Sequence, residues 1–352
     1  LELEIKEVPV LNQVKFTGIK KKSKRDELID ENNLKPGVKV TENLLTTTKN
    51  YIEEKYRKEG YFNAKVALRT SEAPDTTGTP TNKVNMVVDV NQGDRVKIAD
   101  IEFIGNEKLS DAKLRRNMKN TKQKNLFRFW KRSKFVRSDY QEDKESVINK
   151  YKELGYRDAR IIDDTLRKKD EETIALELEV EEGNQYYIGD INFLGNSAYT
   201  DETLDRVLGL NKGDVYNGVL IEERVQGREP NKTSIANLYQ NNGYLFSNID
   251  LVETDVYNDT IDFEIRIVEG KEAYFDEIRV TGNEKTKDHV IYREMRTKPG
   301  QKYSQEAVVA TVRELGQLGF FDAEQLEPKF VEPNPQTGTL SLEYPVVESG
   351  SS

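Results

Sequence analysis

The chain contains no cysteine and only one histidine, His289, among its 352 residues. Without cysteine there is no disulfide, no thiolate nucleophile and no Cys-ligated metal. A single histidine can build neither a zinc site nor a Ser-His-Asp triad. The Gly-x-x-x-x-Gly-Lys phosphate loop and the His-Glu-x-x-His motif are also missing. The sequence therefore predicts a protein that is not an enzyme and holds no cofactor or metal.

Long apolar runs and a net positive charge are missing as well. No stretch approaches the 18 apolar residues that a membrane-spanning helix needs. The net charge is −9, and the chain lacks the basic stripe that is typical of nucleic-acid binders, so we expect no nucleic-acid partner. With 36% hydrophobic and 33% charged residues, the composition favours several small cores over one large core.

The sequence repeats itself four times, as three landmarks in constant order show. The first is an apolar strand that ends in glycine, and it recurs at Gly18, Gly105, Gly195 and Gly282. The second is a glycine followed by an aromatic residue: Gly60-Tyr61, Gly155-Tyr156, Gly243-Tyr244 and Gly319-Phe320. The third is an alternating strand over residues 84–90, 174–180, 261–267 and 340–344. We therefore divide the chain into copies one to four: residues 1–93, 94–183, 184–270 and 271–348.

Each copy has the pattern strand, helix, helix, strand, strand. The expected caps of the first helices are Ser23, Ser110, Thr200 and Thr286. The last strand alternates, so one sheet face should be buried and the other wet. A three-stranded mixed sheet with two helices on one side satisfies this pattern, which gives an α+β fold of four modules in an extended arrangement. Two copies deviate: copy two has an aromatic insertion at residues 126–130, and copy three has a second helix that breaks near residues 227–230.

These landmarks resemble POTRA domains, the polypeptide-transport-associated modules, over essentially the whole chain. Among them, the periplasmic arm of BamA-type outer-membrane assembly factors is the most similar. The bulky loop of copy two resembles the third module of that arm, Tyr216-Asn217-Gly218 the fourth, and residues 293–296 with 315–321 the last. By this resemblance the copies are family modules two to five, and a membrane β-barrel follows them in the full protein.

The resemblance implies a periplasmic scaffold that receives unfolded outer-membrane β-barrel proteins and docks accessory lipoproteins. A client strand would pair with an exposed sheet edge, a mode called β-augmentation. In the family the third strand is central and the second lies at an edge, so the candidate edges are residues 64–68, 159–163 and 248–252. The resemblance favours the edge of copy two: Ala159, Arg160, Ile161, Ile162 and Asp163. The alternative is that charged residues such as Arg160 and Asp163 guard a solvated edge.

Two further contacts follow from the same resemblance. Ile278 and Arg279 match family positions that face an accessory lipoprotein. Phe127, Phe129 and Trp130 would either pack under the inserted loop or contact a partner. A different reading of the whole chain is the POTRA arm of a two-partner secretion or autotransporter-assembly pore. The number of copies and the bulky loop favour the assembly scaffold.

Overall fold

The computed structural model describes residues 7–73, 81–122 and 134–349. By its contacts the chain divides into two compact units. Unit one comprises residues 1–150 and 160–182, and unit two comprises residues 151–159 and 183–352. Each unit is described by itself.

Unit one contains the sheets of copies one and two. Copy one consists of β1 (Val10–Thr17), α1 (Lys22–Glu31), α2 (Glu42–Lys58), β2 (Lys65–Glu72) and β3 (Lys83–Asn91). Copy two consists of β4 (Lys97–Ile104), α3 (Asp111–Asn117), α4 (Arg137–Glu153), β5 (Arg160–Lys168) and β6 (Thr173–Glu181). The last turn of α4 belongs to unit two.

Unit two contains the sheets of copies three and four. Copy three consists of β7 (Tyr187–Leu194), α5 (Asp201–Leu208), α6 (Gly218–Gln226), α7 (Ile235–Asn241), β8 (Asn248–Tyr257) and β9 (Thr260–Val268). Copy four consists of β10 (Tyr274–Thr281), α8 (Asp288–Glu294), α9 (Gln305–Gln317), the 3-10 turn η1 (Ala323–Gln325), β11 (Lys329–Asn334) and β12 (Thr339–Pro345).

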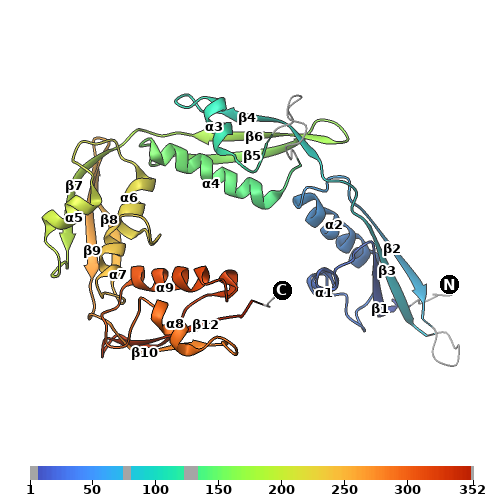
Figure 1. Ribbon diagram of the computed structural model, residues 1–352. Helices are drawn as coiled ribbons and strands as arrows, with labels where there is room; N and C mark the ends of the chain where they lie inside the picture. Colours follow the sequence, from blue (N-terminus) through green and yellow to red (C-terminus); the bar gives the residue numbers. More distant parts are fainter. Residues whose placement is uncertain (1–6, 74–80, 123–133, 350–352) are drawn as a thin grey trace, which may run out of the picture. The chain divides into compact units, whose positions relative to one another are not determined.

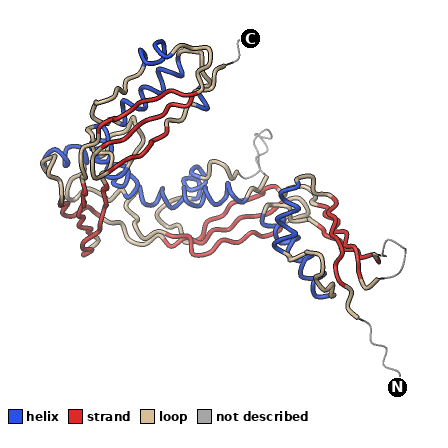
Figure 2. The backbone as a smooth tube through the Cα atoms, turned by 90° about the horizontal axis from the view of Figure 1, so that it is seen from below, coloured by secondary structure: helices blue, strands red, loops and turns tan. Residues whose placement is uncertain are grey.

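All four sheets have the same topology, which confirms the expected fold. The strand orders are β1-β3-β2, β4-β6-β5, β7-β9-β8 and β10-β12-β11. The third strand of each copy is therefore central, parallel to the first strand and antiparallel to the second. The helices of each copy lie on one face of its sheet (Figures 1 and 2). Both the first and the second strand are consequently edges.

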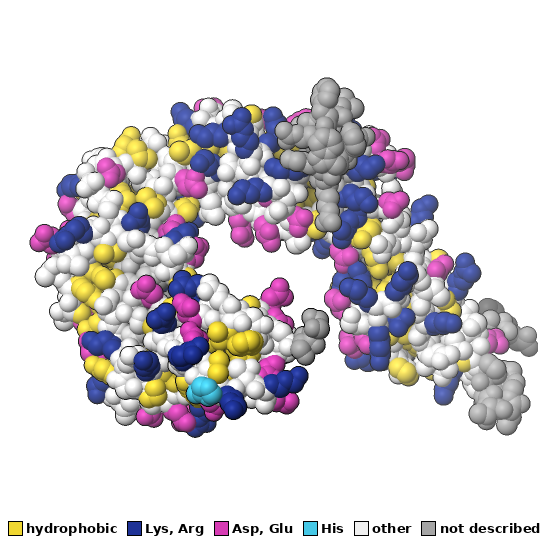
Figure 3. Space-filling model, in the orientation of Figure 1, with side chains coloured by type: hydrophobic (Ala, Val, Ile, Leu, Met, Phe, Trp, Pro, Cys, Tyr) yellow, Lys and Arg dark blue, Asp and Glu magenta, His cyan; other side chains and the backbone are white. Residues whose placement is uncertain are grey.

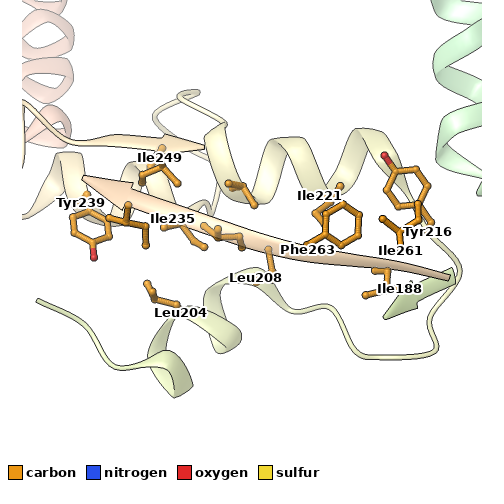
Figure 4. Close-up of a cluster of buried hydrophobic side chains, with 14 residues drawn as sticks. Ile188, Leu204, Leu208, Tyr216, Ile221, Ile235, Tyr239, Ile249, Ile261 and Phe263 are labelled. Carbon is orange, nitrogen blue, oxygen red and sulfur yellow. The ribbon is translucent and has the colours of Figure 1, made fainter. Parts of the chain in front are cut away.

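The core of copy three illustrates how a strand of alternating apolar and polar residues buries one face. Along β9, Ile261, Phe263 and Ile265 are fully buried because every second side chain points toward the helices. Leu204 and Leu208 of α5 pack against them from the helix layer (Figure 4). On the outer surface, Lys and Arg side chains are interspersed with Asp and Glu (Figure 3). The mixed surface agrees with a chain of several small cores.

The repeated glycine after the first strand has a steric cause. Gly195 has φ +88°, and a Cβ atom there would lie 2.1 Å from the carbonyl oxygen of Ile267 in β9. Gly18, Gly105 and Gly282 also have positive φ and approach their own third strands as closely. Only glycine combines this left-handed conformation with so close an approach. The first landmark thus marks where strand one ends beside its parallel neighbour, strand three.

A glutamate holds the turn that follows this glycine in three copies. In copy four, the carboxylate of Glu348 accepts hydrogen bonds from the backbone N–H groups of Lys285 and Thr286. Glu182 and Glu269 occupy the same position in copies two and three and also accept from the turn. Copy one has Gln92 there. The hydrogen bonds lower the pKa of Glu348, because they stabilise its charged form.

Several expected details can be compared with the structure. The break in copy three is confirmed, since α6 ends at Gln226 and α7 begins at Ile235. Thr200 is the N-cap of α5, and its hydroxyl accepts from the N–H of Thr203. Ser110 is also the N-cap of α3, as expected, although its side chain makes no capping hydrogen bond. The other two expected caps were wrong, because Ser23 lies inside α1 and Lys287 takes the place expected for Thr286. The inserted residues 126–130 lie outside the described residues.

Candidate strand-binding edge

The favoured client edge corresponds to β5, the outer strand of the sheet in copy two. β5 pairs with β6 on one side only. Its side chains alternate between half-buried and exposed, as in a strand with one face toward the helices. Ile161 is half-buried, whereas Arg160 and Asp163 are exposed. Ala159, the residue before β5, is buried.

A β-bulge interrupts β5 at Ile162. Ile161 lies opposite Val180 and Asp163 lies opposite Glu179, so Ile162 has no partner on β6. Its side chain is 50% exposed. Bulges are frequent at sheet edges, where they bend the strand and stop uncontrolled pairing. After the bulge, the pairing from Asp163 to Lys168 is regular, and this is the longer regular stretch of the strand.

The other two candidate edges have no register shift within the predicted residues. Residues 64–68 lie at the start of β2, which pairs with β3 without any register shift from Lys65 to Glu72. Residues 248–252 belong to β8, whose pairing with β9 is regular as far as Glu253 and shifts between Glu253 and Asp255. β5 is therefore the candidate edge whose bulge lies within the favoured residues.

Charged side chains cover parts of β5. Arg160 forms an ion pair with Glu181 across the strands, and Lys144 of α4 reaches Asp164 at 3.1 Å. Lys144 also lies 5.1 Å from the ring centre of Tyr140, whose pKa is raised by burial and then by Asp164. These pairs lie on the surface or near it, so each contributes about 1 kcal/mol or less. A competing strand could displace them at small cost.

The expected accessory-partner contact lies on β10, in copy four. The side chain of Ile278 is only 5% exposed and packs into the core of that copy. The guanidinium of Arg279 is exposed and pairs with Glu277. A partner at this position would consequently touch Arg279 and not the side chain of Ile278. The third expected contact, at Phe127, Phe129 and Trp130, lies outside the described residues.

The described residues contain no group of three His, Asp or Glu side chains that could hold a metal ion. None of the helices in this part of the chain combines the length and the apolar character required to cross a membrane. Arg115 of α3 and Tyr292 of α8, which donate hydrogen bonds to backbone carbonyl oxygens of β4 and β10, were not identified from the sequence.

Comparison with known proteins identifies the repeated module. The POTRA family model, described as a surface antigen variable number repeat, matches residues 9–93, 96–183, 186–270 and 273–349. The outer membrane protein assembly factor BamA of Neisseria meningitidis is 26% identical in an alignment of 358 positions, which covers 100% of this chain and 43% of that protein. A putative outer membrane protein assembly factor of Treponema pallidum is also 26% identical, over 92% of this chain and 37% of its own length.

A solved structure shows the same fold. The crystal structure of Haemophilus influenzae BamA POTRA3-5 has a TM-score of 0.58 at 24% identity, and the match covers 72% of this chain and 96% of that one. The chain spans less than half the length of the curated relatives described above. Four matched repeats nevertheless account for nearly all of its residues, so the chain belongs to the POTRA family, as tandem repeats similar to those of BamA proteins.

Proposed function

We propose that the four copies form a periplasmic scaffold in the assembly of outer-membrane proteins, and that β5 receives unfolded client strands. The observation that carries this proposal is that β5 pairs on one side only. The names of the relatives point the same way, because they are outer membrane protein assembly factors. The relatives' names do not suggest an enzyme, and a scaffold requires no catalytic group.

The proposed mechanism is the addition of a client strand to the free edge of β5. Backbone hydrogen bonds supply the affinity, so clients with many different side chains can bind. The bulge at Ile162 limits flat pairing to the regular stretch from Asp163 to Lys168. Residues Arg160 to Ile162 would then flank the client strand instead of forming its centre. Accessory lipoproteins would dock on copy four, where Arg279 is the exposed member of the expected pair.

Site-specific photocrosslinking in cells tests the client edge, with the full-length protein carrying the crosslinker at Ile162 or Thr165. Both positions are exposed on β5. Glu179 provides a matched control, since it is exposed but lies on the central strand β6. We expect unfolded outer-membrane proteins to be trapped from Ile162 and Thr165 and not from Glu179. Equal trapping from all three positions, or none from β5, would reject the client edge.

The lipoprotein contact has a separate test in the same cells. A crosslinker at Arg279 should trap a lipoprotein, whereas one at His289 of α8, which is also exposed in copy four, should not. Trapping of unfolded outer-membrane proteins from Arg279 would contradict the assignment of this position to an accessory partner.

A further inference from the structure

The outer edges of the first strands differ between copies at one equivalent residue. Ile101 of β4, Ile191 of β7 and Ile278 of β10 lie at the same register, opposite Leu176, Phe263 and Leu342 of the central strands. In copy two, the guanidinium of Arg115 donates to the carbonyl oxygen of Ile101 at 2.9 Å. In copy four, the hydroxyl of Tyr292 lies 3.4 Å from the carbonyl oxygen of Ile278 and donates to it. At both edges, a side chain of the first helix thus already occupies the carbonyl oxygen that an added strand would use.

In both of these copies the donor comes from the same helical position. Arg115 is the fifth residue of α3, and Tyr292 is the fifth residue of α8. In copy three the fifth residue of α5 is Asp205. An ionised carboxylate only accepts hydrogen bonds, so it cannot cover a carbonyl oxygen. Among the described residues, none donates a hydrogen bond to the carbonyl oxygen of Ile191 outside its own sheet.

The edge of β7 is also less covered than its counterparts. Ile191 and Phe193 are half-buried, whereas Ile101 and Ile278 are 1% and 5% exposed. Beside Ile191 lies a hollow of about 620 Å³, between β7 and α5, lined among others by Gly189, Asp205 and Leu210. Leu194, at the end of the strand, is 57% exposed. An extended segment could therefore bury apolar surface while it pairs with the strand.

One carboxylate that lines the hollow has no ion-pair partner among the described residues. Lys212 pairs with Asp190 at 2.7 Å, and Arg206 lies 3.5 Å from Glu202. Asp205 forms no ion pair within the described residues. Desolvation, and then the neighbouring Asp201, raise the pKa of Asp205, which is the expected effect of an uncompensated carboxylate beside the sheet. A lysine or arginine would neutralise it.

We propose that the outer edge of β7, from Ile191 to Leu194, binds a basic extended segment of another protein as an added strand. A backbone N–H of the segment donates to the carbonyl oxygen of Ile191, and a lysine or arginine beside it pairs with Asp205. A second copy of this chain is a poor occupant, because its net charge of −9 opposes the acidic hollow. The edge belongs to a different strand from β5, so the inference goes beyond the proposed client edge and is tested separately.

Hydrogen exchange of the four-copy chain with a synthetic peptide tests the proposal. The probe is a ten-residue peptide that alternates valine and threonine and carries two lysines, and its control has glutamates in place of the lysines. We expect the lysine peptide to protect the backbone of residues 191–194 and the glutamate peptide to bind at least tenfold more weakly. The variant Asp205→Arg places an arginine at the position that Arg115 has in copy two, and it should lower the affinity for the lysine peptide at least tenfold.

Two further variants keep the test decisive. Asp205→Asn has the same shape without the charge, and it should weaken the binding of the lysine peptide several-fold. This variant replaces Asp205→Arg if Asp205→Arg proves unfolded. Arg115→Asp removes the donor from copy two and should create new protection at residues 101–104. Unchanged affinity in Asp205→Arg or Asp205→Asn, equal binding of both peptides, or protection confined to β5 would each overturn the proposal. A lack of any binding by the lysine peptide would do the same, while crosslinking from Ile162 would be unaffected.

Discussion

Replacing Gly195 by alanine tests the close approach of the turn after β7 to the end of β9. At φ +88° an alanine is in a left-handed conformation, which costs roughly 1–2 kcal/mol. Its Cβ would also lie 2.1 Å from the carbonyl oxygen of Ile267, so β7 and β9 must move apart. Forcing an atom into a packed interior costs about 1–3 kcal/mol. We expect a total loss of about 2–5 kcal/mol in the stability of copy three.

Gly213 supplies a matched control in the same copy. Its φ of +91° is nearly the same, but a Cβ atom there would meet no atom within 4 Å. Gly213→Ala should therefore lose only the conformational part, roughly 1–2 kcal/mol. Hydrogen exchange of the β9 amides can measure the difference, which we expect to be a 5- to 150-fold larger loss of protection in Gly195→Ala. Equal losses in the two variants would refute the steric explanation of the repeated glycine.

Substitutions at three more positions follow from buried or capping groups. The hydroxyl of Thr311 accepts from the N–H groups of Arg296 and Thr297, so Thr311→Val should destabilise copy four by about 1–3 kcal/mol in a denaturant titration, and Thr311→Ser should retain most of that stability. Ser234 caps α7, and Ser234→Ala should cost about 1 kcal/mol, visible as faster exchange in α7 alone. Because the pKa of Glu348 is lowered in the folded state, its contribution is present above the pKa of the unfolded chain and is lost as the pH falls through the folded pKa. Glu348→Gln should accordingly be less stable than the parent at neutral pH, and the gap should close in acid; a gap independent of pH would contradict the role of the charge.

The repeat and the sheet topology could be predicted from sequence because both depend on local patterns. Alternation along residues 261–267 identifies the buried face, and the glycine at 195 marks a required backbone conformation. Helix starts were predicted less well, because Ser, Thr and Lys all occur near them and the final choice depends on the turn before the helix. At α8, the amide of Asn283 donates to the carbonyl of Thr286 and to Asp288, which moves the start past Thr286.

The bulge at Ile162 and the covering of the first-strand edges could not be predicted in this way. A bulge changes the pairing of β5 with β6 without a distinct residue pattern, since isoleucine is common in regular strands. The bond from Arg115 to Ile101 joins a helix to a strand that precedes it by 14 residues, and the same position holds tyrosine or aspartate in other copies. Only the register between the elements shows that these three residues are equivalent.

The fifth residue of the first helix differs among copies two, three and four, although their sheets have the same topology. The glycine after strand one and the glutamate that accepts hydrogen bonds from the next turn hold the end of strand one beside strand three. The residue before the fifth one, Leu114 or Leu204, is buried and holds the helix against the sheet. Exchanging the two side chains, as Arg115→Asp together with Asp205→Arg, moves one donor from copy two to copy three, so the stability should change by about 1 kcal/mol or less in a denaturant titration. The same exchange should move the protection by the lysine peptide from residues 191–194 to residues 101–104. If the double variant keeps its protection in copy three, the donor at this position does not control which edge is open.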